Sequence, residues 1–267
     1  MKEPGAEQPS ALTLDEIEER LLRLADRIPS PLKAETANAL LGSILGDRIV
    51  LLYRGVLHAL TGPSAITALH HARAVVEAAI LIKWMALDVD TNAPLWFGQA
   101  EEEDVRMIRQ TAAHLPAPLD ERLRIENMTH VLEEKESIAA EGRTAAMAAG
   151  RNYGDRVMPT LARMVEEIET AIPEHSWAIR QAYDMLYRFL SPYSHTSAAS
   201  FKPSLIDRAD GDAVYDPNGS PMPERHLRMV TAPSVAYAYE AVGDLLGDTR
   251  MTVAARILRD LAIDLPG

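Results

Sequence analysis

An arginine and a histidine that could act together on a phosphate lie in the segment 187–195, whose sequence is YRFLSPYSH. Arg188 and His195 flank Pro192, where the apolar helix that leads into the segment should break. Because the break can turn both side chains to one side, the guanidinium could stabilise charge on a phosphoryl group while the imidazole moves a proton from a ribose 2′-hydroxyl. This is the chemistry of a metal-independent ribonuclease, and it makes Arg188 and His195 the candidate catalytic residues.

Hydroxyl side chains in the same segment could orient a substrate, and these are Ser191, Tyr193 and Ser194. A structural alternative stays open for each part of the segment. Asp184 lies four residues before Arg188 and could form an ordinary ion pair with it on a helix surface. The serines and His195 could simply cap helix ends. The pattern therefore predicts a polar site without deciding between catalysis and structure.

A second polar group lies on one face of an earlier apolar helix, expected at about residues 64–88. His70, Arg73 and Glu77 follow one another at spacings of three and four residues, which places them on one helical face. Charged side chains on an apolar helical face are costly to bury unless they are paired. Arg73 and Glu77 either pair with each other as a buried clamp, which we favour, or point toward the pocket of His195 and help to bind a ligand.

Metal and cofactor chemistry find little support in the sequence. Glu126 and His130 stand four residues apart, as in half of a di-iron site, but no second such pair occurs. No His-Glu-x-x-His run, Walker loop, Gly-x-Gly-x-x-Gly turn or Gly-x-Ser-x-Gly elbow occurs either. We therefore expect no metal and no cofactor.

Composition limits the partners and the compartment. The chain has 267 residues, a formal net charge of -12 and no cysteine. This acidity disfavours broad binding to nucleic acid or to acidic membranes but leaves room for a local basic pocket that takes RNA. The lack of thiols fits a reducing compartment, so we expect a cytoplasmic protein. The longest apolar windows carry too many charges to span a membrane, so we expect no membrane partner.

The elements that must position the candidate residues are mostly helices. Apolar residues recur at helical spacing, beginning at a capping box in residues 13–16, with a second helix starting at Pro31. Residues 92–98 contain Pro94 and are expected to form a connection. Residues 214–219 form a strong turn signal, and Pro233 is expected to open the last pair of helices. We predict an all-α multi-helix bundle with one small β-hairpin excursion near residues 213–230. We expect the chain to consist of a disordered N-terminal tail at 1–12 and a single helical domain at 13–267.

Three motifs occur in order along the chain: LHHARAVVE at 69–77, MPTLARM at 158–164 and YRFLSPYSH at 187–195. This order resembles a widespread bacterial family of helical proteins of unknown function. In that family an Arg-x-x-x-Glu helix precedes a Tyr-x-x-Leu-Ser-x-x-x-His segment. The resemblance covers about residues 40–246.

The spacing of Arg188 and His195 is also similar to the Arg-x(4 to 6)-His motif of the HEPN superfamily, whose members include dimeric ribonucleases and toxin components. The resemblance implies a homodimer with a composite site at its two-fold interface, to which each protomer contributes Arg188 and His195. The leading hypothesis is a HEPN-like, metal-independent RNA-cleaving or RNA-binding protein of a defence or toxin system. The competing hypothesis is a non-catalytic binding or scaffold domain.

Overall fold

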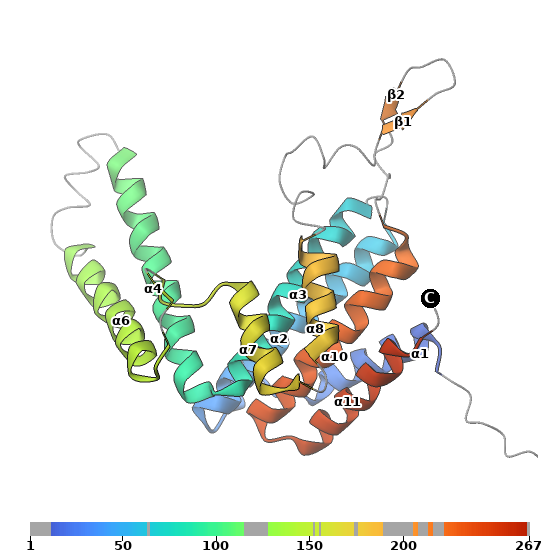
Figure 1. Ribbon diagram of the computed structural model, residues 1–267, viewed down its shortest axis with the longest axis horizontal. Helices are drawn as coiled ribbons and strands as arrows, with labels where there is room; N and C mark the ends of the chain where they lie inside the picture. Colours follow the sequence, from blue (N-terminus) through green and yellow to red (C-terminus); the bar gives the residue numbers. More distant parts are fainter. Residues whose placement is uncertain are drawn as a thin grey trace, which may run out of the picture. The chain divides into compact units, whose positions relative to one another are not determined.

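The computed structural model describes residues 12–62, 65–114, 128–151, 153–154, 156–173, 176–188, 205–207, 213–215 and 222–265. These residues are almost all helical, which confirms the predicted all-α bundle (Figure 1). The predicted tail lies outside the described residues except for Leu12. The chain divides into two compact units: the main unit comprises Met1–Ala86 and Val165–Gly267, and the second unit comprises Leu87–Met164.

The main unit begins with the predicted capping box. The Thr13 hydroxyl accepts a hydrogen bond from the Glu16 amide at 3.3 Å, and the Glu16 carboxylate accepts one from the Thr13 amide at 2.7 Å. Helix α1 (Leu14–Leu24) follows, then two 3₁₀ turns, η1 (Ala25–Arg27) and η2 (Pro31–Lys33), and then α2 (Ala37–Leu60). The start of the second helix was therefore predicted too early. Pro31 opens only a short turn, and Thr36 caps α2 by accepting from the Ala39 amide at 3.1 Å.

Helix α3 (Ala65–Leu87) packs against several elements of the main unit. The Trp84 side chain of α3 is fully buried, and its Nε1 donates to Glu167 of α7 (Leu161–Ala171) at 2.8 Å. On another side, α3 approaches α2 closely at Gly55, where an added Cβ would lie 2.8 Å from Nδ1 of His71. The candidate residues on α3 are therefore held on a well-packed helix.

The C-terminal half of the main unit carries α8 (Ser176–Ala182), which continues into a π-helical turn, η4 (Tyr183–Arg188). Helices α10 (Glu224–Leu246) and α11 (Thr249–Ile263) pack side by side after it and are joined at Gly247, whose φ of 67° suits the left-handed conformation (Figure 1). Helix α10 is buried along most of its length. Near its start, Arg228 Nε donates to Glu18 of α1 at 3.0 Å.

The predicted hairpin at residues 213–230 is not supported. Two short strands, β1 (Leu205–Asp207) and β2 (Ala213–Tyr215), pair antiparallel with Leu205 opposite Tyr215, so they lie mostly before the predicted range. The chain is already helical from Glu224, and Pro233 lies inside α10 where a helix start was expected. Burial of α10 on many sides compensates for the one helical hydrogen bond that a proline removes.

The second unit is an antiparallel pair of long helices, α4 (Val89–His114) and α6 (Met128–Ala148). Residues 92–98, expected to be a connection, belong to α4, and Pro94 lies inside the helix. Close packing explains the difference: an added Cβ at Gly98 would lie 3.4 Å from the Cα of Gly142 in α6. Lys135 of α6 also binds Asp104 of α4 at 2.9 Å. These contacts between helices outweigh the local cost of proline.

Candidate functional site

The candidate catalytic arginine lies at the end of the π-helical turn. Its side chain is 68% exposed, and Nη1 lies 3.4 Å from Oδ1 of Asp184, which is itself 44% exposed. The structure thus forms the helix-surface pair that the sequence offered as a structural alternative. The predicted partners Ser191, Tyr193, Ser194 and His195 lie outside the described residues, so the approach of His195 to Arg188 stays a prediction.

Arg73 is brought to the same turn from α3. Its guanidinium carbon lies 4.7 Å from the centroid of the Tyr187 ring, a cation–π contact. The Tyr187 ring in turn stacks on Tyr183, with centroids 5.5 Å apart and planes inclined by 14°. Arg73, Tyr187 and Tyr183 therefore form a layered array beside Arg188, and these four residues are called the arginine–tyrosine cluster below.

The favoured clamp between Arg73 and Glu77 does not form. Glu77 is exposed, and no ion pair joins it to Arg73 within the part of the chain that the structure describes. The face of the guanidinium rests on Tyr187, while its Nε atom is buried without a hydrogen-bond partner. His70 is exposed on α3, one turn before Arg73. Of the three α3 candidates, Arg73 is the one that contacts the described part of the segment leading to His195, at Tyr187.

The π-helical turn explains how the sequence builds this array. Tyr183 and Tyr187 are four residues apart and stack along one side of the turn, while Leu186 is fully buried and anchors the turn in the core. A π-helical turn inserts one extra residue per turn, and such turns are frequent at functional sites. The two tyrosines were not among the predicted site residues. Their spacing of four was the available signal, since aromatic side chains at that spacing meet on a helix.

A comparison with the neighbouring Arg180 shows why the cluster is chemically distinctive. Arg180 Nε donates to Glu169 at 2.9 Å, and this hydrogen bond holds the pKa of the Glu169 carboxyl below its usual range. Arg188 has only the long, exposed contact with Asp184, and Arg73 contacts no carboxylate among the described residues. The cluster therefore offers one arginine that contacts no carboxylate among the described residues and a second that is paired only with an exposed aspartate, beside stacked aromatic rings.

Such an arrangement can bind a phosphate beside aromatic rings. A guanidinium matches the geometry of phosphate oxygens, and aromatic rings provide the sequence-tolerant stacking that single-stranded nucleic acids use. The three comparisons with known proteins add nothing to this assignment, because no family model, curated protein or solved structure matches the chain. The function is therefore argued from the residues themselves.

Other kinds of site find no counterpart in the described ranges. Within them, no group of three or more His, Cys, Asp or Glu side chains is placed to hold a metal ion. His130, from the di-iron alternative, is exposed on α6, and Glu126 lies outside the described residues. No helix in the part that the structure describes has the length and apolar character required to cross a bilayer.

Proposed function

We propose that this chain is a HEPN-like protein that binds single-stranded RNA at the arginine–tyrosine cluster and cleaves it without a metal ion. The observation that supports the proposal is the position of Arg73 on the ring of Tyr187, next to the exposed Arg188. Tyr187 and Arg188 belong to the segment 187–195 that also contains His195, and Tyr183, which stacks on Tyr187, lies four residues before Tyr187. This combination of cations and aromatic rings is the one that RNA-binding surfaces use.

In the proposed reaction, Arg188 binds the scissile phosphate and stabilises the negative charge that develops on it. His195 removes the proton of the ribose 2′-hydroxyl, and the 2′-oxygen forms a bond to phosphorus. The bond from phosphorus to the 5′-oxygen breaks, leaving a 2′,3′-cyclic phosphate. A proton from the second His195 of the homodimer neutralises the departing 5′-oxygen. Arg73 and Tyr187 position the RNA and take no part in proton transfer.

A cleavage assay tests this proposal. Wild-type protein should cut a fluorescently labelled single-stranded RNA in the presence of EDTA, with a cyclic phosphate on the product. His195→Ala and Arg188→Ala should each slow cleavage by about 100-fold or more, the usual contribution of a general base or a charge-stabilising group. His58→Ala and Arg48→Ala change exposed residues of α2 and serve as matched controls that should cleave normally. Equal cleavage by wild type and His195→Ala would refute the mechanism.

The second candidate function is a non-catalytic binding or scaffold domain. The Asp184–Arg188 pair favours it, because a carboxylate next to the arginine competes with phosphate. The net charge of -12 favours it as well, since it repels RNA at long range. RNA binding measured by fluorescence anisotropy at several salt concentrations, together with the cleavage assay, separates the two functions. The ribonuclease proposal predicts binding that weakens as salt rises, followed by cleavage of the bound RNA, whereas a non-catalytic binding or scaffold domain leaves the RNA intact whether or not it binds it.

A further inference from the structure

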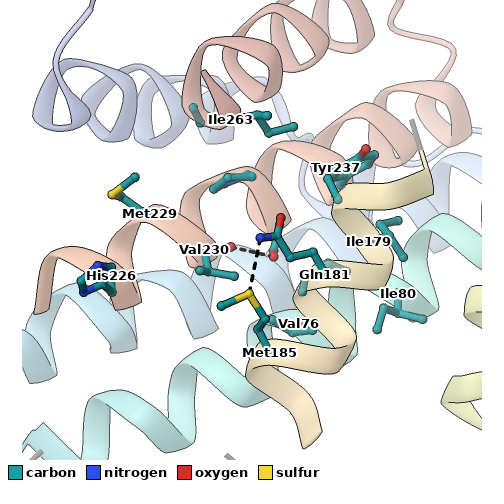
Figure 2. Close-up of a pocket in the computed structure, with 16 residues that line it drawn as sticks. Val76, Ile80, Ile179, Gln181, Met185, His226, Met229, Val230, Tyr237 and Ile263 are labelled. Carbon is teal, nitrogen blue, oxygen red and sulfur yellow. Dashed lines mark hydrogen bonds between the residues drawn. The ribbon is translucent and has the colours of Figure 1, made fainter. Parts of the chain in front are cut away.

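The main unit contains a pocket of about 220 Å³ that the proposed function does not use. Helices α3, α8, α10 and α11 and the turn η4 contribute its walls, which are largely aliphatic (Figure 2). Representative lining residues are Val76, Ile80, Ile179, Val230, Tyr237 and Ile263. A dry apolar cavity of about 150 Å³ in another protein holds benzene. The pocket therefore has room for a molecule somewhat larger than one aromatic ring.

The wall formed by α10 offers hydrogen-bond acceptors. Pro233 lines the pocket and has no N–H, so the carbonyl of Met229, four residues earlier, receives no helical hydrogen bond from that position. Ser234 also lines the pocket, and its hydroxyl donates to the Val230 carbonyl at 2.9 Å, which leaves the lone pairs of the oxygen as acceptors. A ligand that carries a donor group can bind the Ser234 hydroxyl oxygen.

The rim of the pocket is adaptable. Met185 and Gln181 face α10 from the opposite side, and the Gln181 amide donates weakly to the Met185 sulfur at 3.4 Å (Figure 2). Met229 lies on the α10 side of the same opening (Figure 2). Methionine side chains change rotamer at low cost, and their sulfur atoms make favourable contacts with the edges of aromatic rings. Two methionines at the rim therefore favour an aromatic guest.

One wall of the pocket is supported by a chain of contacts behind it. The Tyr237 ring lines it, and the guanidinium carbon of Arg259 lies 4.9 Å from the centroid of that ring. Arg259 is in turn bound to Glu240 at 2.6 Å. A wall fixed in this way limits how far a ligand can penetrate, so a flat, compact molecule fits better than a long chain.

We infer that this pocket binds a small aromatic molecule of one or two fused rings that carries one N–H or O–H group, the chemistry of an indole or a phenol. This site is distinct from the arginine–tyrosine cluster and does not depend on RNA cleavage. Met185 belongs to the turn η4, which also carries Tyr187 and Arg188. A bound ligand would therefore contact the same turn through a different side chain.

Calorimetric titration with indole tests the inference. Wild-type protein should bind indole, and it should bind indene, which has the same size without the N–H group, about fivefold or more weakly because a hydrogen bond is lost. Equal affinity for both molecules would overturn the assigned donor group. Failure of the wild type to bind either molecule would overturn the site.

Two substitutions locate the binding. Ala182→Phe fills the pocket from the wall of α8, and Met229→Trp closes it from the partly exposed rim. Each should lower indole affinity at least tenfold, while Ala37→Phe, at an exposed position of α2, should bind as wild type does. Circular dichroism checks folding, and Met229→Trp decides the matter if the buried Ala182→Phe variant does not fold. Normal indole binding by folded Met229→Trp would place the ligand elsewhere and refute the inference.

Discussion

Cationic side chains of the main unit have opposite surroundings at two places along α3. At one, Glu240 is 6% exposed and lies 2.6 Å from Arg259, 3.1 Å from Arg256 and 3.5 Å from Lys83. At the other, Arg73 rests on the Tyr187 ring, and Arg188 makes only a long contact with an exposed aspartate. The first arrangement holds a buried carboxylate among three cations, of which Lys83 and Arg259 are buried and Arg256 is half exposed. The second places Arg73 on an aromatic ring and leaves Arg188 exposed to solvent.

This difference separates residues that hold the fold from residues that can hold a ligand. Arg259 is 1% exposed, so its charge is tolerable only because Glu240 and Asp260 balance it. The same desolvation raises the pKa of the adjacent Tyr237 to about 12, and the phenol stays neutral at physiological pH. Arg188 needs no such balance because water already solvates it, so a phosphate can replace that water. We expect substitutions in the two places to differ sharply in stability and in RNA binding.

The largest effect should come from Glu240→Gln. The substitution keeps the shape of the side chain and removes its charge, which leaves buried Lys83 without this carboxylate and buried Arg259 with only the half-exposed Asp260. We expect the free energy of unfolding to fall by about 3 to 5 kcal/mol in urea titrations. Glu19→Gln alters the exposed pair with Arg23 and should cost less than about 1 kcal/mol. A similar small loss for Glu240→Gln would show that the buried cluster does not stabilise the fold.

Gly243→Ala should cause the second-largest loss of stability, because it disturbs the packing of α10 on α11 that brings Glu240 and Arg259 together. An added Cβ would lie 2.6 Å from Oγ1 and 2.7 Å from the backbone nitrogen of Thr252. The helices must then move apart, which should cost about 1 to 3 kcal/mol in the same titration. Gly62→Ala is the control, since its nearest neighbour would be 3.5 Å away. Unchanged stability of Gly243→Ala would mean that the two helices can separate freely.

Asp248 should show an intermediate, pH-dependent effect. Its carboxylate caps α11 by accepting from the amides of Arg250 and Met251, each at 3.1 Å, and it binds Arg27 Nε at 2.9 Å. Burial pushes its pKa upward, but the hydrogen bonds and the charge of Arg27 outweigh burial and hold the pKa below its usual value. The stabilisation is therefore fully present above the unfolded-state pKa of about 3.9 and disappears as the pH falls through the lower folded-state pKa.

Asp248→Ala should accordingly cost about 1 to 2 kcal/mol at neutral pH, the usual loss for a helix cap together with an ion pair. Asp248→Asn keeps a capping oxygen and should cost less. Urea unfolding at neutral pH and again below the folded-state pKa measures the difference. If the gap between wild type and Asp248→Ala stays constant over this range, ionisation of Asp248 does not stabilise the fold.

Substitution of Tyr187 should have a smaller effect on stability and a larger effect on RNA affinity. Tyr187→Phe keeps the ring under Arg73, whereas Tyr187→Ala removes it. Tyr187→Ala should therefore be about 1 kcal/mol less stable than Tyr187→Phe, and it alone should lose RNA affinity by fluorescence anisotropy. Equal RNA affinity of the two variants would remove the aromatic ring from the proposed site.

The smallest effect on stability should be that of Arg188→Ala. The pair with Asp184 is exposed on both sides, so its loss should change the free energy of unfolding by less than about 0.5 kcal/mol. Asp184→Ala should be equally mild, and it should strengthen RNA binding because it frees the guanidinium. Both variants are compared by urea unfolding and by anisotropy. A loss of several kcal/mol in Arg188→Ala would assign that residue to the fold.

Contacts between residues close in sequence could be predicted well. The long-range contact of Arg73 on α3 could not. The capping box at Thr13 and Glu16 and the pair of Asp184 with Arg188 both join residues that are three or four positions apart. The choice of partner for Arg73 was different. Glu77 lies at the right spacing for a pair, yet Tyr187 from a distant part of the chain occupies the face of the guanidinium. No helical spacing could reveal that contact.

The same limit explains two of the errors in placing elements. Pro94 and Pro233 are strong local signals for a break, and each lies inside a helix. At Pro94 the helix continues because Gly98 packs closely on Gly142 of α6, and at Pro233 because neighbouring helices bury α10. In both cases a contact with another helix outweighs the loss of one backbone hydrogen bond.

The sequence by itself determined the helical class and the start of α1, and it offered the surface pair at Arg188 as one of two alternatives, because helix formation and capping depend on residues within about four positions of each other. The tertiary structure alone decided which cations are buried around Glu240, which one rests on Tyr187, and where the walls of the pocket meet. These outcomes depend on which helices pack together. That choice is made by the burial of apolar surface across the whole unit, and burial is not encoded in the spacing of any single segment.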